Sequence, residues 1–250
     1  MQQEIPLSGG NANFGVVRVG NTVRKPWTEH SCGVLAYMRI LRDRGIDLPE
    51  PMGQDGQGRM ILEFVAGSLA MDCPALTHAQ LGRVGAMVRA IHDASQGLDA
   101  NVLELSPALI PVTDPDLVCH GDLTPWNLLV GERWVFIDWD GAAASSRLWD
   151  LAYSAQAFTL NDATADPVRA AADLRAFVDG YGADAALRAE LATTLAPRAW
   201  AMYGHLKTSH REGREPWASM YASFHGAHWR GVARFLEENT HVWENALMVR

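Results

Sequence analysis

The stretch from residue 117 to residue 140 constrains the fold more than any other part of the chain. It holds three short apolar runs, Leu117–Cys119, Leu128–Val130 and Trp134–Ile137, with polar residues between them. Each polar group therefore follows or precedes a short strand, and a rigid strand end fixes the position of the side chain next to it. The pattern predicts a site built on the loops that join short strands.

The rest of the sequence divides into two unlike parts. Up to residue 67, β-rich runs at 14–19, 22–25 and 59–65 surround one stretch of helical spacing over 29–44. From residue 68 onward, apolar residues recur mostly at helical spacing. Helices are expected after Thr77, from Asp166-Pro167 to Gly180, over 185–196, over 198–211, and as one long helix from Pro216. We therefore expect an α+β fold with a small β-rich lobe, 1–67, and a larger helical lobe, 68–250.

Composition excludes several classes of protein. No apolar run approaches the roughly 18–20 residues that a membrane helix needs. The first residues lack the basic start and apolar core of a secretory signal, so we expect a cytoplasmic location. Three scattered cysteines predict neither a disulfide framework nor a zinc cluster. A formal net charge of −8 argues against nucleic acid as a partner.

One spacing of polar residues indicates a chemistry. His120-Gly121-Asp122 is followed by Asn127 after five positions and by Asp138 eleven positions later. Phosphoryl transfer from a nucleoside triphosphate needs a carboxylate that accepts the proton of the attacking hydroxyl, and oxygen ligands that hold Mg²⁺ against the phosphates. Asp122 fits the catalytic base, and Asn127 and Asp138 fit the metal ligands.

These motifs resemble those of a known family. The run HGDLTPWN resembles the H-x-D-x-x-x-x-N catalytic loop of aminoglycoside phosphotransferases and their choline-kinase-like relatives, and FIDWD resembles their I-D-[WF] metal segment. Arg147 to Ala152 is similar to the D-P-x-x-D-L-A ending, and Ile91-His92-Asp93 is more weakly similar to another family motif. The resemblance implies a bilobal protein-kinase-like fold, Mg²⁺ as cofactor and ATP or GTP as phosphoryl donor.

The resemblance also implies roles for neighbouring residues. His120 is expected to hold the catalytic loop by hydrogen bonds rather than to transfer protons. Asp150 is expected to cap a helix and to brace that loop. Asp140 stands where protein kinases have a glycine, and it is either a residue behind the metal ligands or part of a solvated turn.

In the small lobe, the resemblance places a nucleotide near two segments. A glycine-enriched loop containing Gly10 and Asn11 is expected to offer backbone N–H groups to phosphate oxygens. In the strand over 22–25, Val23 is expected against the nucleobase and Lys25 against the phosphates. Arg24 is the alternative, one register step away.

Two further features of this lobe bear on nucleotide binding. The helix over 29–44 has no glutamate in its middle, and Glu29 lies a turn too early, so the expected partner of the lysine is in doubt. The backbone of Glu63, Phe64 and Val65 is expected to bind the edge of the nucleobase, as the family hinge does.

The function expected from these observations is phosphorylation of a small-molecule hydroxyl, with an aminoglycoside-type antibiotic as the favoured acceptor. The alternatives are a metabolic kinase acting on an amino alcohol, sugar or nucleoside, and a non-catalytic pseudokinase or immunity-type binding protein. Residues 68–250 carry the whole excess of negative charge, fourteen basic against twenty-two acidic residues, which favours a cationic acceptor. We expect a monomer or homodimer that binds neither nucleic acid nor a membrane.

Overall fold

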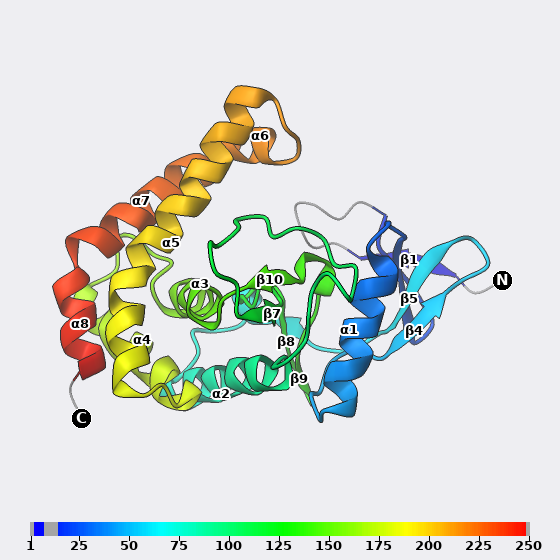
Figure 1. The fold of residues 1–250 in the computed structure, drawn as a ribbon, viewed down its shortest axis with the longest axis horizontal. Coiled ribbons are helices and arrows are strands. Elements are labelled where there is room, and N and C mark those ends of the chain that lie inside the picture. The colour runs from blue at the N-terminus through cyan, green and yellow to red at the C-terminus, as the bar shows by residue number, and fades with distance from the viewer. Residues whose placement is uncertain (1–2, 8–14, 249–250) are drawn as a thin grey trace.

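The computed structural model describes residues 3–7 and 15–248. Figure 1 shows a β-rich part, which carries the N-terminus, and a larger helical part, which carries the C-terminus at the opposite end of the molecule. The α+β architecture predicted from the sequence is therefore confirmed. Within the described residues, no helix combines the length and the apolar character that crossing a bilayer requires. The division into lobes at residue 67 stays a prediction.

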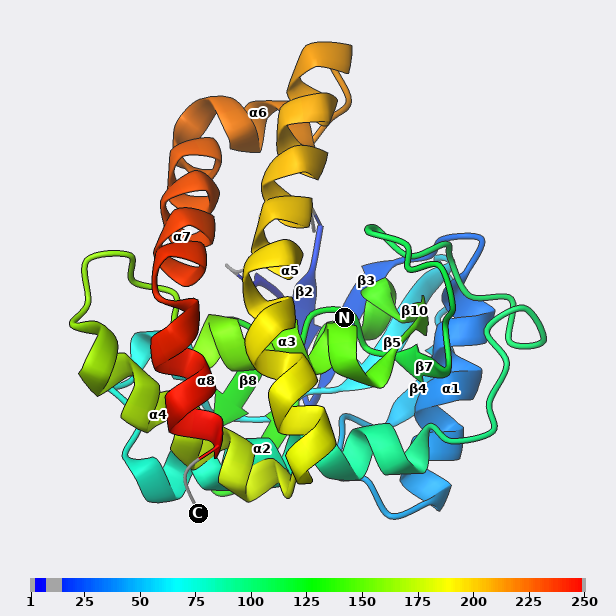
Figure 2. The same cartoon turned by 60° about the vertical axis from the view of Figure 1, so that its left-hand side comes forward.

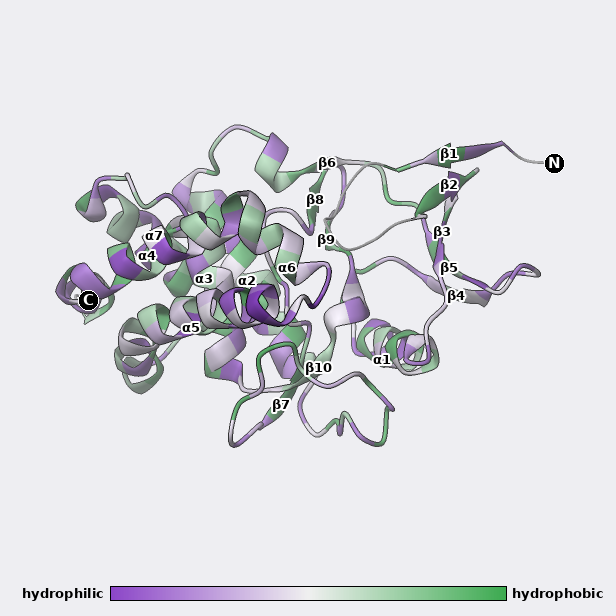
Figure 3. Ribbon diagram, turned by 90° about the horizontal axis from the view of Figure 1, so that it is seen from above, coloured by the Kyte–Doolittle hydropathy of each residue, from purple (hydrophilic) through white to green (hydrophobic). Residues whose placement is uncertain are grey.

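The β-rich part is an antiparallel five-stranded sheet with the order β1-β2-β3-β5-β4. Helix α1, Ser31–Asp43, packs beside it (Figure 3). The sequence did not predict β4, because proline and glycine disfavour strands. Both are tolerated here because β4 is an edge strand with an irregular register against β5. The strands are β1 Glu4–Pro6, β2 Val17–Val19, β3 Thr22–Pro26, β4 Pro51–Gln54 and β5 Arg59–Glu63.

Two small sheets lie in the middle of the molecule, as predicted from the apolar runs. One has the order β6-β8-β9 and the other pairs β7 with β10. Figure 1 shows them between α1 and α3, so the loops at their ends lie where the two parts of the molecule meet. The elements are β6 Ser68–Leu69, β7 Leu117–Cys119, β8 Leu128–Val130, β9 Trp134–Phe136 and β10 Ala143–Ser145, with short 3₁₀ turns at Ala70–Asp72 and Trp139–Gly141.

Helix ends in the helical part follow from local sequence. Thr77 caps α2, His78–Ala94, through a reciprocal capping box with Gln80. Asp166 caps α4, Pro167–Tyr181, and proline occupies its first turn as predicted. The helix ends at Tyr181 rather than at Gly180, because Gly182 adopts the left-handed conformation that closes it. Helix α3 spans Arg147–Thr159.

The prediction of two helices over 185–196 and 198–211 is wrong. One helix, α5, runs from Ala185 to Glu212 and contains Pro197. An internal proline removes a backbone hydrogen bond and costs about 3 kcal/mol. The helix continues because its buried side chains on both sides of Pro197, such as Leu195 and Ala199, pack in one stripe against α3, α7 and α8.

The single long helix predicted from Pro216 is also wrong. The segment forms α6, Trp217–Met220, a π-helical turn, Tyr221–His225, and then α7, Gly226–Glu238, and α8, Thr240–Met248. Figure 2 shows the second half of α5 and α7 rising side by side from the body, with α6 near the top. The helical part therefore presents a hairpin of helices beyond the small sheets.

Candidate active site

The loop after β7 carries the sequence motif, and its glycine is required by geometry. Gly121 has φ +83°, and a Cβ atom there would lie 2.8 Å from the carbonyl oxygen of Gly141. Any L side chain would be strained in this conformation and would collide with that carbonyl group. Gly121 thus lets the catalytic loop pass directly beside the turn that follows Asp138.

His120 ties this loop to the end of β9. Its side chain is buried, its Nδ1 atom accepts a hydrogen bond from the Asp122 backbone N–H at 3.2 Å, and its Nε2–H donates to the Ile137 carbonyl at 3.1 Å. These partners select the neutral tautomer with the proton on Nε2. Burial lowers the pKa of His120 below its ordinary value, which favours the same form. Its contacts agree with the predicted loop-holding role.

Asp122, the predicted base, is held by two donors. Its Oδ2 atom accepts hydrogen bonds from Asn127 Nδ2 at 2.7 Å and from Trp126 Nε1 at 3.2 Å. The other oxygen, Oδ1, is buried and has no hydrogen-bond partner among the described residues. Burial raises the pKa of Asp122 to about 6, and the nearby Asp138 charge acts in the same direction, against the side chains of Trp126, Tyr153 and Asn127. A fixed carboxylate with one unengaged oxygen suits a proton acceptor.

The two predicted metal ligands lie side by side. Ile137 donates its backbone N–H to the Asn127 carbonyl at 2.8 Å, which places Asn127 next to Asp138. Asp138 adopts a left-handed conformation, φ 65° and ψ 59°, that few residues other than glycine and Asn or Asp accept. Because Asn127 turns its amide nitrogen toward Asp122, its amide oxygen is directed elsewhere. An amide oxygen and a carboxylate are the hard oxygen donors that Mg²⁺ prefers, so this pair fits the ion.

Lys25 joins the same cluster from the β-rich part. Its Nζ atom lies 2.6 Å from Asp138 Oδ1 and 2.7 Å from Asp140 Oδ2, and its side chain is only 7% exposed. Burial by itself would lower the pKa of Lys25, but the two carboxylates raise it above its ordinary value. Arg24 points to the other face of the strand, with its Nε atom 3.3 Å from Asp55. The register thus brings Lys25, and not Arg24, to the candidate site.

The partner of this lysine is not a glutamate of α1. Glu29 is 87% exposed and lies beside His30. Within α1, a Cβ atom at Gly33 would overlap the backbone carbonyl of Leu103, so the loop after α2 occupies the place where a side chain would stand. Asp140 supplies the second carboxylate instead. The sequence left the role of Asp140 open. Its position, two residues after Asp138, was the one feature of the sequence that pointed to a second carboxylate at the site.

Asp150 braces the catalytic loop from α3. It is 3% exposed, its Oδ1 atom accepts the Gly121 backbone N–H at 3.1 Å, and its Oδ2 atom accepts the His92 Nε2–H at 3.0 Å. His92 Nδ1 in turn contacts the Tyr181 hydroxyl at 2.9 Å. The predicted bracing contact is present, whereas the predicted cap is wrong because Ser146 caps α3 through the Trp149 N–H.

Two of the three expected hinge residues already use their backbone N–H groups within the fold. The Glu63 and Phe64 backbone N–H groups are engaged by the carbonyls of Glu50 and Asn21, both at 2.9 Å. Of the three expected hinge residues, Val65 alone has a backbone N–H without a hydrogen bond to the described part of the chain. The prediction that the backbone of these three residues binds the edge of the nucleobase stays a prediction, with the Val65 N–H as the donor available for it.

Of the other residues predicted to contact the nucleotide, the structure describes Val23 but not Gly10 or Asn11. Val23 is half-buried and packs against the core. It lies on the same face of β3 as Lys25, because side chains two positions apart in a strand share a face. Gly10 and Asn11 lie outside the described residues.

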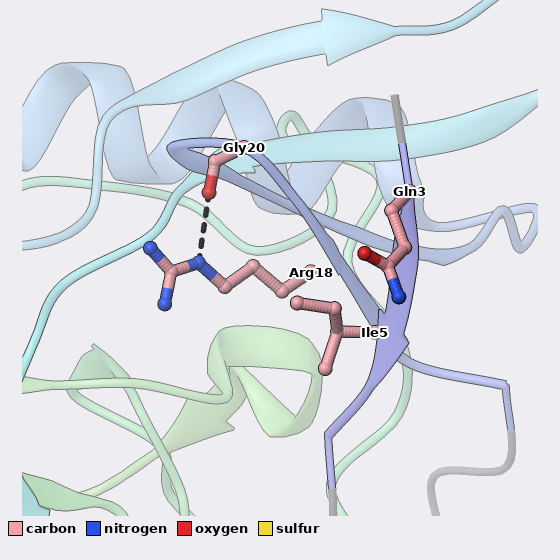
Figure 4. A pocket seen from close by; sticks show the side chains of 4 residues that line it. All are labelled: Gln3, Ile5, Arg18 and Gly20. Atoms are coloured by element: carbon pink, nitrogen blue, oxygen red, sulfur yellow. Dashed lines mark hydrogen bonds between the residues drawn. The ribbon is translucent and has the colours of Figure 1, made fainter. Parts of the chain in front are cut away.

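Two cavities of similar size lie away from Asp122 and Asp138. One of about 360 Å³ opens at the edge of the five-stranded sheet and is lined by Gln3, Ile5, Arg18 and Gly20, with Arg18 bonded to the Gly20 carbonyl (Figure 4). The other, of about 330 Å³, has Arg83, Arg133 and Trp134 among its lining residues. Neither contains Asp122 or Asp138.

The fold and this arrangement of residues define the class of the protein: it has a protein-kinase-like fold, as its structural neighbours do. A model of the phosphotransferase enzyme family matches residues 92–192, which include His92, the catalytic loop and Asp150. The resemblance to aminoglycoside phosphotransferases and choline-kinase-like proteins, predicted from the motifs, is thereby confirmed. Among curated proteins, none matches the sequence significantly.

Solved structures similar to this chain include kinases of several small molecules. A choline/ethanolamine kinase family protein from Mesorhizobium loti is 16% identical, with a TM-score of 0.62 over 99% of this chain and 92% of the other. An amicoumacin kinase in complex with AMP-PNP, Ca²⁺ and Ami is 14% identical, with a TM-score of 0.65 over 96% and 88%. A GDP complex of aminoglycoside 2'-phosphotransferase-IIIa is 15% identical, with a TM-score of 0.58 over 96% and 93%.

Proposed function

We propose that the protein transfers the terminal phosphoryl group of a nucleoside triphosphate to the hydroxyl group of a small molecule. The observation that carries this proposal is the convergence of Asp122, Asn127, Asp138 and Lys25 from three separate segments of the chain. A general base, two hard oxygen ligands and a lysine are the parts that phosphoryl transfer requires. The match of the phosphotransferase family model over this segment supports the same reaction.

Each residue has a defined task in this reaction. Asp122 accepts the proton of the acceptor hydroxyl through Oδ1, while the N–H donors of Trp126 and Asn127 hold Oδ2 in place. The acceptor oxygen forms a bond to the terminal phosphorus, and the bond from that phosphorus to the bridging oxygen breaks, so the nucleoside diphosphate leaves. A magnesium ion held by Asn127 and Asp138 would neutralise charge on the phosphates.

Lys25 has to change partners when nucleotide binds. In the structure its ammonium group pairs with both Asp138 and Asp140. These two carboxylates neutralise its charge, so little attraction for a phosphate is left. A cation on Asp138 would offset that carboxylate and let Lys25 turn toward the phosphates. We therefore propose that metal and nucleotide bind together rather than independently.

The identities of the phosphoryl donor and of the acceptor are further parts of this proposal. The neighbours' complexes with GDP and AMP-PNP support a purine nucleotide, either ATP or GTP, as the donor. Their names include aminoglycoside, amicoumacin and choline/ethanolamine kinases, so both an antibiotic and a metabolic alcohol belong among the candidate acceptors. The complete set of catalytic residues weighs against the alternative of a non-catalytic binding protein.

The test is nucleotide turnover with a panel of acceptors. ATP and GTP are each supplied with Mg²⁺ and with aminoglycosides, other hydroxylated antibiotics, amino alcohols, sugars, nucleosides and hydroxy acids, and the phosphorylated product is identified by mass. Asp122→Asn serves as the control that separates this protein's activity from a contaminating kinase. Nucleotide binding without transfer to any acceptor, unchanged in Asp122→Asn, would support the pseudokinase alternative.

A further inference from the structure

Arg198 is a buried cation that the proposed reaction does not use. It lies on α5 with 6% of its surface exposed, and its Nε and Nη1 atoms are buried without a hydrogen-bond partner among the described residues. A buried charge is strongly unfavourable unless it is paired, and polar groups in protein interiors almost always have a partner. The missing partner of this guanidinium group therefore needs an explanation.

The surroundings of Arg198 provide aromatic contacts but no acceptor. Its guanidinium carbon lies 4.2 Å from the ring centre of Tyr153 and 5.4 Å from that of Trp149, both on α3. Cation–π contact offsets part of the charge, but it leaves the N–H donors unsatisfied. The indole Nε1 of Trp149 is buried without a partner as well. Two kinds of donor that lack an acceptor thus lie where α3 packs along α5 (Figure 2).

Arg198 and Trp149 lie close to Asp122, the predicted base. Tyr153 contacts Arg198 and also lies close enough to Asp122 to affect the pKa of that carboxyl group. Burial lowers the pKa of the Arg198 guanidinium group, whereas Tyr153 and the carboxylates of Asp150 and Asp122 act in the opposite direction. Lys25 reaches Asp138 from the β-rich part of the molecule, whereas Tyr153 and Arg198 belong to the helical part. The donors at α3 and α5 therefore belong to the helical part of the molecule, on the side of Asp122 where Tyr153 lies.

We propose that Arg198, together with the Trp149 N–H, binds a carboxylate of the phosphoryl acceptor, so that the acceptor is a hydroxy acid. A guanidinium group presents its donors in a planar fork that matches the two oxygens of a carboxylate. The inference rests on the phosphotransferase function proposed above. It revises the expectation of a cationic acceptor, because Arg198 is a buried cation whose Nε and Nη1 atoms lack an acceptor among the described residues, whereas the negative balance of residues 68–250 is a sum over the whole helical part.

The first test compares acceptors that differ only in a carboxylate. Suitable pairs are glycerate with glycerol, serine with ethanolamine, and homoserine with 3-aminopropanol, each measured as kcat/KM for phosphoryl transfer. The wild type should prefer the acid in at least one pair by about tenfold or more, the range expected for a charge-assisted hydrogen bond. Arg198→Met should lose that preference while changing kcat/KM for the alcohol without a carboxylate by less than about twofold, and Arg198→Lys should restore part of it.

The matched control is Arg211→Met, which removes another arginine of α5 whose side chain is 76% exposed. It should leave both members of each pair unchanged. A wild type that transfers phosphate to the alcohols and never prefers the acid would overturn the inference and leave the phosphotransferase function standing. An equal loss on both members of a pair in Arg198→Met would also overturn it, because that result is the signature of a general structural role.

The second test does not depend on catalysis. Methionine keeps an unbranched stem and removes the unpaired charge, so Arg198→Met should leave the Tm of the ligand-free protein unchanged or raise it. A fall of several degrees would show that Arg198 stabilises the fold, which overturns the inference. If the wild type uses no acceptor at all, the proposed function fails. The inference is then judged by whether glycerate, serine or homoserine raises the Tm of the wild type but not of Arg198→Met, and no shift in the wild type would overturn it.

Discussion

Lys25 and Asp138 form an ion pair of 2.6 Å between residues that are 113 positions apart in the chain. One comes from the middle of the five-stranded sheet and the other from the turn after β9. The contact joins the β-rich part to the catalytic loops directly. Under the proposed function, this one ammonium group would couple nucleotide binding to metal binding.

The first prediction concerns that ammonium group. Lys25→Met should lower kcat/KM for the nucleotide by about 10–100-fold, because a charged hydrogen bond to a phosphate contributes roughly 1.5–3 kcal/mol. Arg24→Met is the matched control, since Arg24 points to the opposite face and pairs with Asp55. It should change kcat/KM by less than about twofold. The reverse pattern would show that β3 is shifted by one residue, with Arg24 and not Lys25 facing the site.

The second prediction concerns the base. Asp122→Asn should retain the fold and nucleotide binding but lower kcat by on the order of 10²–10⁴, the usual contribution of a positioned general base. The amide has nearly the same shape, so the hydrogen bonds of Trp126 and Asn127 change little in geometry. Nucleotide affinity by calorimetry and kcat by product formation separate the two effects. Unchanged kcat would show that Asp122 has only a structural role.

The third prediction concerns the metal site. Asp138→Asn should remove magnesium-dependent nucleotide binding more completely than Asn127→Ala, because a carboxylate offers the ion a full charge. Asparagine is chosen because it tolerates the left-handed conformation of residue 138, which alanine does not. In the wild type, EDTA should weaken nucleotide binding to the level of Asp138→Asn. Equal binding with and without magnesium would contradict the proposed ligands.

The sequence was informative where chemistry depends on local spacing. His120, Asp122, Asn127 and Asp138 lie in one continuous stretch, and the structure brings them together as that spacing predicts. Sequence reasoning could not pair Lys25 with Asp140, because that contact depends on how the two parts of the molecule meet.

The continuity of α5 and the burial of Arg198 were also harder to predict, because both depend on tertiary packing. Tertiary packing overrides the local preference of Pro197, so a break was expected where α5 continues. Arg198 was not recognised, although the signal was present. Its position continues the apolar stripe of Leu191, Leu195 and Met202, where a charged residue is unexpected.

The fourth prediction concerns the dependence of stability on pH. Burial would raise the pKa of Asp93, but hydrogen bonds and charge from Arg89 and Arg147 lower it below 3.8. A carboxyl group whose pKa is depressed in the folded state contributes stability at higher pH and loses that contribution as pH falls through the folded pKa. Asp93→Asn should therefore lower the free energy of unfolding at pH 7 by up to about 1 kcal/mol, since the side chains of Asp93 and Arg89 are more than a third exposed and solvent screens their charges. Urea unfolding of both proteins from pH 7 to pH 3 should show that their difference in the free energy of unfolding vanishes at pH 3. A difference that stays constant with pH would show that the Asp93 charge is not its cause.

The last prediction concerns the contact between α2 and α4, which positions His92 behind the catalytic loop. A Cβ atom on Gly180 would overlap the backbone of Gly82, so the two helices approach this closely only because residue 180 is glycine. Alanine has the better intrinsic helix propensity by about 1 kcal/mol, but forcing the helices apart costs roughly 1–3 kcal/mol or more. Gly180→Ala should therefore destabilise the protein in urea unfolding. Gly204→Ala is the matched control, because that glycine lies within α5 with no atom in reach of a Cβ, and it should stabilise the protein by about 0.5–1 kcal/mol. Stabilisation by both substitutions would show that α2 and α4 do not pack as closely as described.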